Sequence, residues 1–456
     1  MPITLQSLTS KIPDDRTAFI FSSGIQIKHG FLRSQVDLYR AIINETKGKK
    51  VVIYGRSRQE FALLLYFLDG TASEILFLPT DINKKLYQEY IDQVQVDYAA
   101  EYSDEDGIKL IAVNTNMTVA NNEVAEVAEV AEVASTDWII PTSGTTNVPK
   151  LVAHKLDGLT RTIKSNSDLG KKFTWGLVYD IYRFAGIQVY LQALLGGSAL
   201  IIPSSDMNIS VMLSFFYESE CNTISATPSF WRKALMSPSA NELKLTNITL
   251  GGEIADTQIL KSLRYQFPLA KIRHIYASTE AGVGFSVNDG KAGFPVSYLN
   301  SDESGVGLKT DDSGQLCIKP NKISQHYMSG DSMHNQDGYI NTGDLVEVKD
   351  NRVIFLGRDS GAINVGGNKV QPEEVERCIL ETGLVNQVVV YAKNSSMLGS
   401  LVCANVVLNS LDKDKKTAKQ EILSQCKRGL EAYKVPAIIK FVDDIETTQS
   451  GKIKRG

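Results

Sequence analysis

The sequence predicts an α/β protein with more than one domain. Strand-like apolar runs at Val51–Tyr54 and Ile75–Leu78 flank an amphipathic, helix-like segment at Gln59–Leu68. This alternation of short strand and helix is typical of sheets covered by helices. A chain of 456 residues can bury large cores, and its length favours roughly two to four domains. The composition, with 43% hydrophobic and 22% charged residues, is that of an ordinary globular protein.

Charge and cysteine content exclude several classes of function. A formal charge of −4 provides no basic field for nucleic acid or an anionic membrane, although a small anionic substrate needs only a local site. The cysteines are odd in number and lack a Cys-x-x-Cys pair, which favours reduced, buried thiols over disulfides or zinc: Cys221, Cys317, Cys378, Cys403 and Cys426. The first residues resemble no signal peptide, and apolar runs such as Phe61–Leu68 are too short to span a membrane. We therefore expect a cytoplasmic protein without a membrane span.

The loop at Pro141–Lys150 is the first candidate site, and it follows the strand-like run Trp138–Ile140. Four hydroxyl side chains surround Gly144, which lets backbone amides approach a ligand, and Lys150 adds a positive charge. The hydroxyl residues are Thr142, Ser143, Thr145 and Thr146. Phosphate is the ligand that this chemistry favours. The spacing is not that of a Walker loop, and a Ser/Thr-rich turn between a strand and a helix is the alternative.

The remaining elements follow in order. Glu123–Val133 is a Glu-Val-Ala repeat, whose period of three rotates an apolar stripe by about 60° per repeat. We expect an exposed connector there, with partner binding as the alternative. A helix is predicted at Ile187–Leu195 and another from Pro228, because proline favours the first helical position. Strands are predicted at Leu200–Pro203, Thr223–Ala226, Ile248–Leu250 and Lys271–Tyr276.

The loop resembles the phosphate loop of the acyl-adenylate-forming (AMP-binding) superfamily, which includes acyl- and aryl-CoA ligases, stand-alone adenylation enzymes and luciferase. Asn147 replaces a family glycine, a mild change because asparagine tolerates a left-handed backbone. Further blocks resemble the family in its order: Gly251–Glu253, Tyr276–Glu280, Tyr339–Asp344, Gly357–Asp359, Ile363–Glu376 and Gly451–Arg455. Together the blocks run through more than two thirds of the chain.

The resemblance implies a fold and a domain boundary. We expect a large N-terminal AMP-binding domain over residues 1–358, with two helix-flanked sheets and a small barrel-like sheet. A small, mobile α+β lid domain is expected over residues 359–456. The family's hinge position falls on Ser360.

The resemblance also implies nucleotide-binding roles. The loop residues from Thr142 to Thr146, together with Lys150, would hold phosphates, and Gly251, Gly252 and Glu253 would lie against adenine. Tyr276 would stack on adenine, and Thr279 would contact the α-phosphate. Glu280, with Thr145, would hold Mg²⁺. Asp344 and Arg358 would bind the ribose, and Lys452 would be the catalytic lysine.

Two departures bear on the acid substrate. Family members that activate α-amino acids have an Asp where this chain has Phe184, so a non-amino acid is expected. Many CoA ligases have a His where this chain has Arg183, which could pair with a substrate group, guide a carrier thiol or clamp Asp180. The expected acid pocket comprises Tyr179, Tyr182, Arg183, Phe184, Gly186 and Gly282. His154 follows the loop, either near the nucleotide or as a structural histidine.

The resemblance implies an ATP-dependent ligase that forms an acyl- or aryl-adenylate and transfers the acyl group to a pantetheine thiol. Gly366 and Gly367 would wall the thiol channel. The expected cofactors are ATP, Mg²⁺ and either CoA or a phosphopantetheinylated carrier protein, and an acyl or peptidyl carrier protein is a possible partner. Two alternatives remain: transfer to an amine, and a non-catalytic homologue, which the changes at Asn147, Ala277 and Ser360 suggest.

Overall fold

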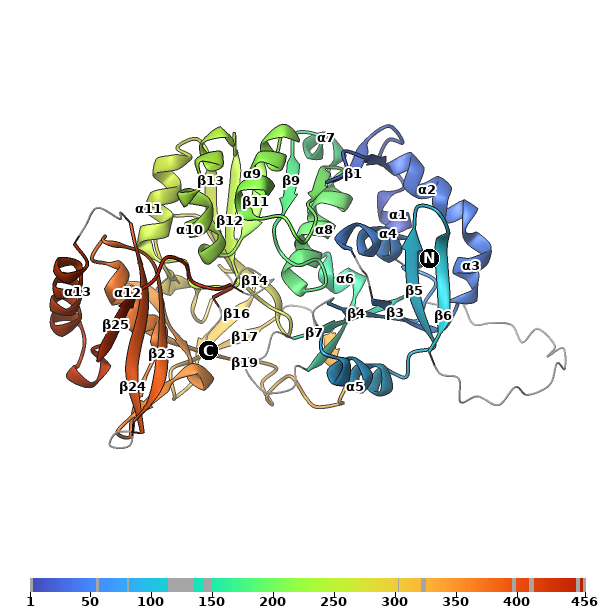
Figure 1. The fold of residues 1–456 in the computed structure, drawn as a ribbon. Helices are drawn as coiled ribbons and strands as arrows, with labels where there is room; N and C mark the ends of the chain where they lie inside the picture. The colour runs from blue at the N-terminus through green and yellow to red at the C-terminus, as the bar shows by residue number, and fades with distance from the viewer. Residues whose placement is uncertain are drawn as a thin grey trace. The chain divides into compact units, whose positions relative to one another are not determined.

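The computed structural model describes residues 3–54, 57–79, 82–113, 135–142, 150–301, 303–320, 325–395, 399–409, 414–447 and 452–453. The chain divides into two compact units, and both mix helices with sheets (Figure 1). Unit 1 comprises residues 1–224, 278–282 and 322–333, and unit 2 comprises residues 225–277, 283–321 and 334–456. Within the described ranges, no helix is both long and apolar enough to cross a lipid bilayer.

Unit 1 contains a seven-stranded sheet in the order β18-β8-β7-β4-β3-β5-β6. Its central strands β7, β4, β3 and β5 run parallel, whereas β8 is antiparallel to β7. The strands are β3 (Lys50–Tyr54), β4 (Glu74–Leu78), β5 (Tyr98–Ser103), β6 (Gly107–Ala112), β7 (Asp137–Pro141), β8 (Leu151–Lys155) and β18 (Gln325–Tyr327). The parallel strands are nearly continuous apolar runs, as expected for a sheet covered on both faces.

A second group of unit 1 strands has the order β9-β10-β1-β2. Here β9 (Thr174–Leu177), β10 (Ala199–Ile202) and β1 (Thr17–Phe21) are parallel, and β2 (Gln26–Lys28) is an antiparallel neighbour of β1. Strand β11 (Thr223–Ala226) lies where the chain passes from unit 1 into unit 2.

The helices of unit 1 include one that differs from the sequence expectation. Helix α4 (Arg58–Leu68) begins at Ser57, whose Oγ accepts a hydrogen bond of 3.1 Å from the Glu60 amide. Every residue of Phe61–Leu68 is buried, so α4 is a core helix and not an amphipathic one. The other helices are α1 (Leu5–Thr9), α2 (His29–Leu38), α3 (Arg40–Glu45), α5 (Lys84–Val94), α6 (Leu156–Leu159), α7 (Ser167–Gly170), α8 (Phe184–Gly196) and α9 (Ile209–Glu218).

Unit 2 begins with a parallel pair of strands and two helices. β12 (Asn247–Gly251) pairs with β13 (Lys271–Ser278), and α10 (Pro228–Met236) and α11 (Thr257–Gln266) precede them in turn. β14 (Gly282–Val287) follows β13 at the sheet edge. Because β12 and β13 are parallel, their carboxyl ends meet at one edge of the sheet, which is where ligands bind in open α/β sheets.

An antiparallel five-stranded sheet of unit 2 has the order β15-β20-β19-β17-β16. It consists of β15 (Phe294–Pro295), β16 (Gly307–Thr310), β17 (Gln315–Lys319), β19 (Ile340–Lys349) and β20 (Arg352–Arg358). This sheet is the predicted small barrel-like sheet, and the shift of pairing register between Leu345 and Val346 gives β19 an irregularity there.

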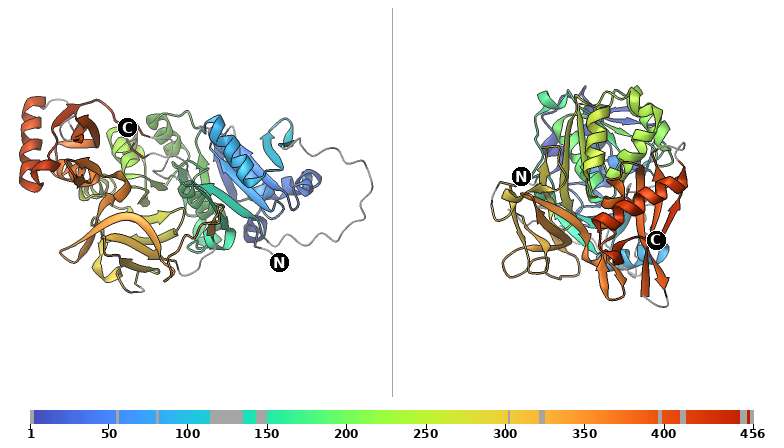
Figure 2. Two further views of the ribbon diagram at one scale, coloured as in Figure 1. Left: turned by 90° about the horizontal axis from the view of Figure 1, so that it is seen from below. Right: turned by 90° about the vertical axis from the view of Figure 1, so that its left-hand side faces the viewer.

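The C-terminal part of unit 2 is a small α+β layer, drawn in orange to red (Figures 1 and 2). Its sheet has the order β22-β21-β24-β23, with β25 parallel to β24. Its elements are β21 (Ile363–Val365), β22 (Asn368–Val370), α12 (Pro372–Leu380), β23 (Val385–Ser395), β24 (Gly399–Leu408), α13 (Lys415–Gly429) and β25 (Ile438–Phe441). Buried aliphatic side chains such as Val375, Ile379 and Val406 form its own core.

The predicted fold class is confirmed, and so are the predicted strands and helices. Helix α8 begins at Phe184, three residues before the predicted start, because Arg183 still has an extended backbone. The Glu123–Val133 repeat lies outside the described residues. The predicted domain boundary at residues 358 and 359 stays a prediction.

Candidate active site

A carboxylate of β19 organises one corner of unit 2. The Asp344 Oδ2 accepts a hydrogen bond of 2.6 Å from the Tyr276 hydroxyl, and its Oδ1 accepts one of 3.0 Å from Arg358 Nε. Asp344 and Arg358 are opposite each other in the β19–β20 pair, so the sheet register itself brings them together. The Asp344 amide donates to the Thr342 hydroxyl at 3.1 Å. The structure thus unites three residues that the sequence predicted for nucleotide binding.

Tyr276 is held by aromatic packing as well as by its hydroxyl. Its ring stacks on Phe285 and on Phe355, each with a ring-centre separation of 5.3 Å. Burial, and next the negative charge of Asp344, raise the pKa of the Tyr276 hydroxyl well above its usual value. The phenol therefore stays a hydrogen-bond donor at neutral pH. Stacking of Tyr276 on adenine stays a prediction.

Lys452 lies beside the glycines at the end of β12. A Cβ atom placed on Gly252 would lie 3.3 Å from Lys452 Cε, and Gly252 has a φ of +80°. Both the available space and the backbone conformation therefore call for glycine at this position. The predicted catalytic lysine and the predicted glycine turn meet here, although they are two hundred positions apart in the sequence.

Glu253 has a structural role that the sequence did not indicate. Its Oε1 accepts a hydrogen bond of 2.8 Å from the backbone amide of Ile453, the neighbour of Lys452. Its Oε2 accepts one of 3.0 Å from the Ser229 amide in the first turn of α10. Both carboxylate oxygens thus bind backbone, and Glu253 positions Lys452 beside Gly252. A direct contact of Glu253 with adenine stays a prediction.

The phosphate loop is described only at its two ends, and Ser143, Gly144, Thr145 and Thr146 lie outside the described residues. The Thr142 amide donates to the Lys150 carbonyl at 2.8 Å, and the Lys150 amide donates to the Thr142 hydroxyl at 3.0 Å. These bonds extend the β7–β8 pair by one step and close the base of the loop. Lys150 Nζ lies 4.5 Å from the centre of the Tyr327 ring, a cation–π contact.

Glu280 and Thr279 lie in unit 1 next to β18 and β8. The Glu280 carbonyl accepts a hydrogen bond of 2.7 Å from Gln325 Nε2, whereas its carboxylate makes no hydrogen bond or ion pair within the described residues. Burial, and next the charge of Glu280, raise the pKa of Tyr327 to about 12. Tyr327 therefore neighbours both Lys150 and Glu280, and the sequence gave no signal for it.

His154 on β8 is fully enclosed by these segments. It hydrogen-bonds to the Thr279 backbone, and its ring centre lies 5.6 Å from that of Phe184. Nε2 has no partner in the described chain. Burial, followed by the nearby His326, lowers the pKa of His154 to about 3. His154 is therefore neutral, and it links predicted catalytic and pocket residues.

Arg183 makes only a loose contact with Asp180. The distance from Arg183 Nε to Asp180 Oδ2 is 3.9 Å, too long for a hydrogen bond, and the Arg183 side chain is 28% exposed. Asp180 is buried and also faces Arg58, whose Nη1 lacks a partner in the described chain. Burial lowers the pKa of Arg58 from its usual value. Arg183 and Asp180 therefore form only a weak ion pair. The Arg183 guanidinium keeps hydrogen-bond donors that another group can bind.

The other predicted pocket residues are mostly buried. Tyr179, Tyr182 and Phe184 belong to the core, and the Tyr182 hydroxyl donates to the Ser57 carbonyl at 3.2 Å. At Gly186, a Cβ atom would lie 2.1 Å from the Asp180 carbonyl oxygen, so close packing requires glycine there. By contrast, Gly282 has a φ of +73° and open space where a Cβ would lie. Their roles in an acid pocket stay predictions.

The predicted thiol-channel glycines form the tight turn between β21 and β22. Gly366 and Gly367 have φ values of +58° and +89°, which only glycine adopts easily in a two-residue hairpin. The Gly367 amide donates to Asn364 Oδ1 at 2.9 Å. Ser360, the predicted hinge, lies in the 3-10 turn Asp359–Gly361 between β20 and β21. The thiol channel and the hinge stay predictions.

The donor set fits a magnesium ion that is shared with a phosphate ligand. Mg²⁺ is usually bound by one or two carboxylates plus substrate phosphates. In the described ranges, no group of three His, Cys, Asp or Glu side chains could form an all-protein metal cage. The carboxylate of Glu280, which no described protein group binds, suits the shared arrangement.

Two family profiles match the chain. The profile of AMP-binding enzymes matches residues 10–328, and the profile of the C-terminal domain of AMP-binding enzymes matches residues 374–452. The first alone covers more than half of the chain.

Curated relatives match over nearly the full length. A D-alanine–D-alanyl carrier protein ligase of Lacticaseibacillus rhamnosus is 24% identical over 95% of this chain and 93% of its own length. A 2-succinylbenzoate–CoA ligase of Listeria monocytogenes is 24% identical over 90% of this chain and 88% of its own. Both relatives are ligases, and they act on different acids and different acceptors.

Solved structures have the same fold. An anthranilate CoA ligase in complex with anthranoyl-AMP has a TM-score of 0.76 at 14% identity, with coverage of 99% of this chain and 96% of that chain. An o-succinylbenzoate coenzyme A synthetase of Bacillus subtilis, in complex with ATP and a magnesium ion, has a TM-score of 0.69 at 19% identity, with coverage of 98% and 97%. Together with the two profile matches and the geometry around Asp344 and Lys452, these likenesses show that the chain belongs to the family of AMP-binding enzymes.

Proposed function

We propose that the chain is an ATP-dependent ligase that activates a non-amino carboxylic acid as an acyl-adenylate and transfers the acyl group to a pantetheine thiol. The observation that carries the proposal is the position of Lys452. This cation lies against the Gly252 turn, and Glu253 anchors the backbone next to it. Such an arrangement suits a lysine that stabilises charge on ATP.

The chemistry needs no side-chain nucleophile. A thiol does not displace an oxide ion from a carboxylate, because oxide is a poor leaving group. In an acyl-adenylate the leaving group is AMP, which departs much more easily. The carboxylate oxygen attacks the α-phosphorus, the bond to pyrophosphate breaks, and negative charge gathers on the phosphoryl oxygens. Lys452, Lys150 and the loop amides would stabilise this charge.

Magnesium suits the same step. When bound, Mg²⁺ would neutralise the pyrophosphate that leaves. Glu280 would hold it, together with Thr145 and the phosphates, because the Glu280 carboxylate has no other partner in the described chain. Asp344 and Arg358 would orient the ribose, which fixes the α-phosphorus relative to the acid.

The acid side supports a non-amino substrate. An ammonium group needs a carboxylate partner in a buried pocket, and Phe184 occupies the position of the family's amino-acid Asp. One relative named above is a D-alanine–D-alanyl carrier protein ligase, and an identity of 24% is compatible with a different acid. Arg183 and Arg58 share one carboxylate neighbour, Asp180, whose distance to Arg183 is 3.9 Å, and Arg58 Nη1 has no hydrogen-bond partner in the described chain. Two cations beside one carboxylate favour an acid with a second anionic or hydroxyl group.

The acceptor would be CoA or a carrier protein. The glycine turn at Gly366–Gly367 presents backbone without side chains, which suits a narrow pantetheine arm in either acceptor. Transfer to an amine would instead show as product formation without any thiol. A cytoplasmic location fits the reduced cysteines, all five of which are free and buried.

The test is acid-dependent exchange of labelled pyrophosphate into ATP, measured across fatty, aryl and amino acids. We expect exchange with one class of non-amino acid. Lys452→Ala should reduce exchange by about a thousandfold, because it removes a charge that acts on the transition state. Lys440→Ala, an exposed lysine of β25, is the matched control and should leave exchange unchanged.

Two results would contradict the proposal. No exchange with any acid, despite measurable ATP binding, would favour the non-catalytic homologue. Intact exchange in Lys452→Ala, with only thioester formation lost, would show that the lysine acts in the second half-reaction and not in adenylation.

A further inference from the structure

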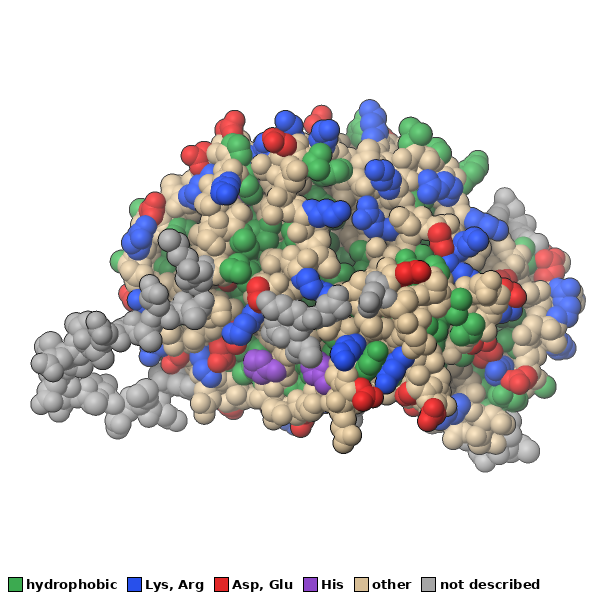
Figure 3. Space-filling model, turned by 180° about the vertical axis from the view of Figure 1, so that it is seen from behind, with side chains coloured by type: hydrophobic (Ala, Val, Ile, Leu, Met, Phe, Trp, Pro, Cys, Tyr) green, Lys and Arg blue, Asp and Glu red, His purple; other side chains and the backbone are tan. Residues whose placement is uncertain are grey.

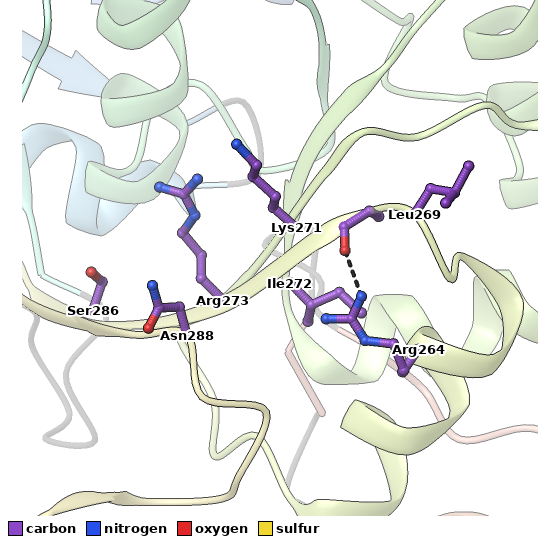
Figure 4. Close-up of a pocket in the computed structure, with 8 residues that line it drawn as sticks. Arg264, Leu269, Lys271, Ile272, Arg273, Ser286 and Asn288 are labelled. Atoms are coloured by element: carbon purple, nitrogen blue, oxygen red, sulfur yellow. Dashed lines mark hydrogen bonds between the residues drawn. The ribbon is translucent and has the colours of Figure 1, made fainter.

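A hollow of about 430 Å³ lies on unit 2, lined by residues of α11, β13 and β14 and of the loops that join and follow them (Figure 4). Its lining residues are Arg264, Leu269, Ala270, Lys271, Ile272, Arg273, Ser286 and Asn288. Three of the eight are cations and none is an acid. We call this set the α11–β13 surface.

The cations of this surface are not neutralised by the protein. Lys271 and Arg273 are exposed and project from the same side of β13 (Figure 4), and neither makes an ion pair within the described residues. Arg264 Nη1 donates to the carbonyls of Pro268 and Ala270 at 3.2 and 2.8 Å, which fixes its direction but leaves its charge. These bonds hold the guanidinium at the wall of the hollow.

Positive charge is concentrated in the segment of the chain that forms this surface, and the segment contains no acidic residue. From Thr257 to Thr279 there are four Lys or Arg residues and no Asp or Glu, although the whole chain carries −4. On the face drawn in Figure 3, Lys and Arg side chains gather over the upper middle, whereas acidic and basic side chains are interspersed along the edges and the lower half. A cluster of one sign on an acidic protein would orient a partner of opposite charge.

Two apolar side chains that are close to these cations in the sequence are strongly exposed. Leu269 is 93% exposed and Tyr265 is 89% exposed, the highest values among the large hydrophobic residues of the described chain, where the next is Leu38 at 67%. A single exposed leucine needs no explanation. Here a leucine and a tyrosine lie four residues apart and are both strongly exposed, in a segment that also contains arginines, and Tyr and Arg are enriched at protein interfaces. Burying both would remove apolar surface from water.

The shape and chemistry favour one class of partner. A free anion would gain little from exposed, hydrated lysine and arginine side chains, and it would leave Leu269 and Tyr265 uncovered. A membrane is flat on this scale and would not fill a hollow, and the net charge of −4 disfavours a nucleic acid. An acidic protein segment with an apolar side chain would satisfy the cations, the leucine and the hollow together.

The surface lies away from the proposed nucleotide-binding residues of the same unit, Tyr276, Asp344 and Arg358, which we call the nucleotide corner. Lys271 begins β13, whereas Tyr276, which binds Asp344, lies five residues later near the carboxyl end of that strand. At about 3.3 Å per residue, the two positions are roughly 16 Å apart. A partner docked at Lys271 would therefore not block Asp344.

We propose that the α11–β13 surface docks an acidic protein partner, which places acidic side chains against Arg264, Lys271 and Arg273 and an apolar side chain against Leu269. Salt would weaken the docking because the cations are exposed, and charge complementarity would accelerate association. The proposal does not depend on which acid the protein activates.

The test uses the full chain and a labelled synthetic helical peptide in which glutamate and leucine alternate in pairs, with binding followed by fluorescence anisotropy at low and physiological salt. We expect saturable binding. The double variant Lys271→Glu/Arg273→Glu should weaken it by about tenfold or more, and Leu269→Ser should weaken it several-fold, on the order of the loss of one interface anchor.

Matched controls keep the test specific. Lys261→Glu makes the same kind of charge change on α11 at a residue that does not line the hollow, and Leu38→Ser removes an exposed leucine of α2. Both should bind the peptide as the parent chain does. Pyrophosphate exchange should be unchanged in every one of these variants, since none touches the nucleotide corner, and this readout keeps the docking test separate from the proposed activity.

Several outcomes would overturn the proposal. Equal binding of a peptide with glutamine in place of glutamate, or equal loss in Lys261→Glu, would show that no specific acidic recognition occurs. If inorganic pyrophosphate displaces the peptide when both are present at the same concentration, the surface is a site for small anions. The parent chain should also be tested with anionic phospholipid vesicles and with duplex DNA. If it binds either of them more tightly than it binds the peptide, the surface serves that partner instead.

Discussion

The proposed nucleotide region of unit 2, around Asp344 and Glu253, and the proposed acid side of unit 1, around Arg183 and His154, differ in how their polar atoms are paired. Around Asp344 and Glu253, all four carboxylate oxygens accept hydrogen bonds of 2.6 to 3.0 Å from the protein. On the acid side, the Arg183–Asp180 distance is 3.9 Å, and Arg58 Nη1 and His154 Nε2 have no partner in the described chain. Buried polar atoms are normally satisfied, so we propose that the first region is preorganised by the protein and that a ligand satisfies the polar atoms of the second.

The comparison suggests a division of labour. ATP is common to every adenylating enzyme, and a rigid site for it loses little entropy on binding. The acid differs from one enzyme to another, and its pocket needs groups that a substrate can satisfy. We therefore expect variants of the first region to reduce activity with every acid, and variants of the second to change which acid is preferred.

Among the variants that test this comparison, the largest effect is expected at Asp344, the centre of the preorganised region. Asp344→Asn removes the charge that Arg358 and Tyr276 bind, and it leaves both donors with a poorer acceptor. The Asp344 carboxylate is proposed to accept hydrogen bonds from the ribose, and charge-assisted hydrogen bonds contribute about 1.5–3 kcal/mol. The Kd for ATP should therefore rise roughly tenfold to hundredfold, as measured by calorimetry. An unchanged Kd would show that Asp344 serves only the packing of Tyr276.

Glu253 should give the next largest effect, and one of a different kind. Glu253→Gln keeps the shape but leaves either the Ile453 or the Ser229 amide without an acceptor, which would loosen the backbone beside Lys452. The rate of pyrophosphate exchange should fall by about tenfold, equal to about 1.4 kcal/mol, whereas the Kd for ATP should change little. If the Kd rises and the rate does not, Glu253 binds the nucleotide directly.

The same contrast explains what the sequence could predict. The strands near the site follow from apolar runs, and the motif residues Asp344, Arg358 and Lys452 stand in recognisable patterns. Their meeting depends on register and on long-range packing: Asp344 faces Arg358 across β19–β20, and Gly252 meets Lys452 across two hundred positions. The roles of Glu253 and Tyr327 could not be predicted, because each depends on a neighbour that is distant in the sequence.

The sequence predicted an amphipathic helix at α4, and its full burial could not be predicted for a related reason. The helix contains Gln59 and Glu60 at its start, which gives it an amphipathic appearance, but Phe61–Leu68 is apolar on every side. A helix that is hydrophobic all round is buried, and only the arrangement of the neighbouring sheet shows what covers it. The acid pocket is hidden in the same way, since pocket residues come from segments that local patterns do not connect.

The pKa of His154 on the acid side can be tested by measuring how the free energy of unfolding depends on pH. Its folded pKa of about 3 lies below the ordinary value of 6.5, so below pH 6.5 the unfolded chain binds a proton that the folded chain does not. The stabilising contribution of neutral His154 is therefore complete above pH 6.5 and is lost as the pH falls towards 3. His154→Gln cannot be protonated, and it keeps a donor for the Thr279 carbonyl.

The comparison to make is between unfolding free energies of the parent and His154→Gln, measured in urea at pH 7.5 and pH 5.5. The parent should lose about 1.4 kcal/mol more than the variant over this range. An equal loss would mean that His154 is protonated in the folded protein, and its Nε2 would then be a donor and not the free acceptor that distinguishes the acid side.

Arg183 should show the smallest effect and the most selective one. Its contact with Asp180 is long and partly exposed, and such pairs contribute about 0–1 kcal/mol, so Arg183→Ala should leave the melting temperature nearly unchanged. With a panel of acids in the exchange assay, kcat/KM should fall several-fold for the preferred acid and stay constant for acids that lack a second polar group. Tyr265→Ala, a large exposed side chain of α11, is a control for substitution as such. An equal fall with every acid would place Arg183 with the preorganised region, and the loose geometry of the acid side would then reflect weak packing and not selection of a substrate.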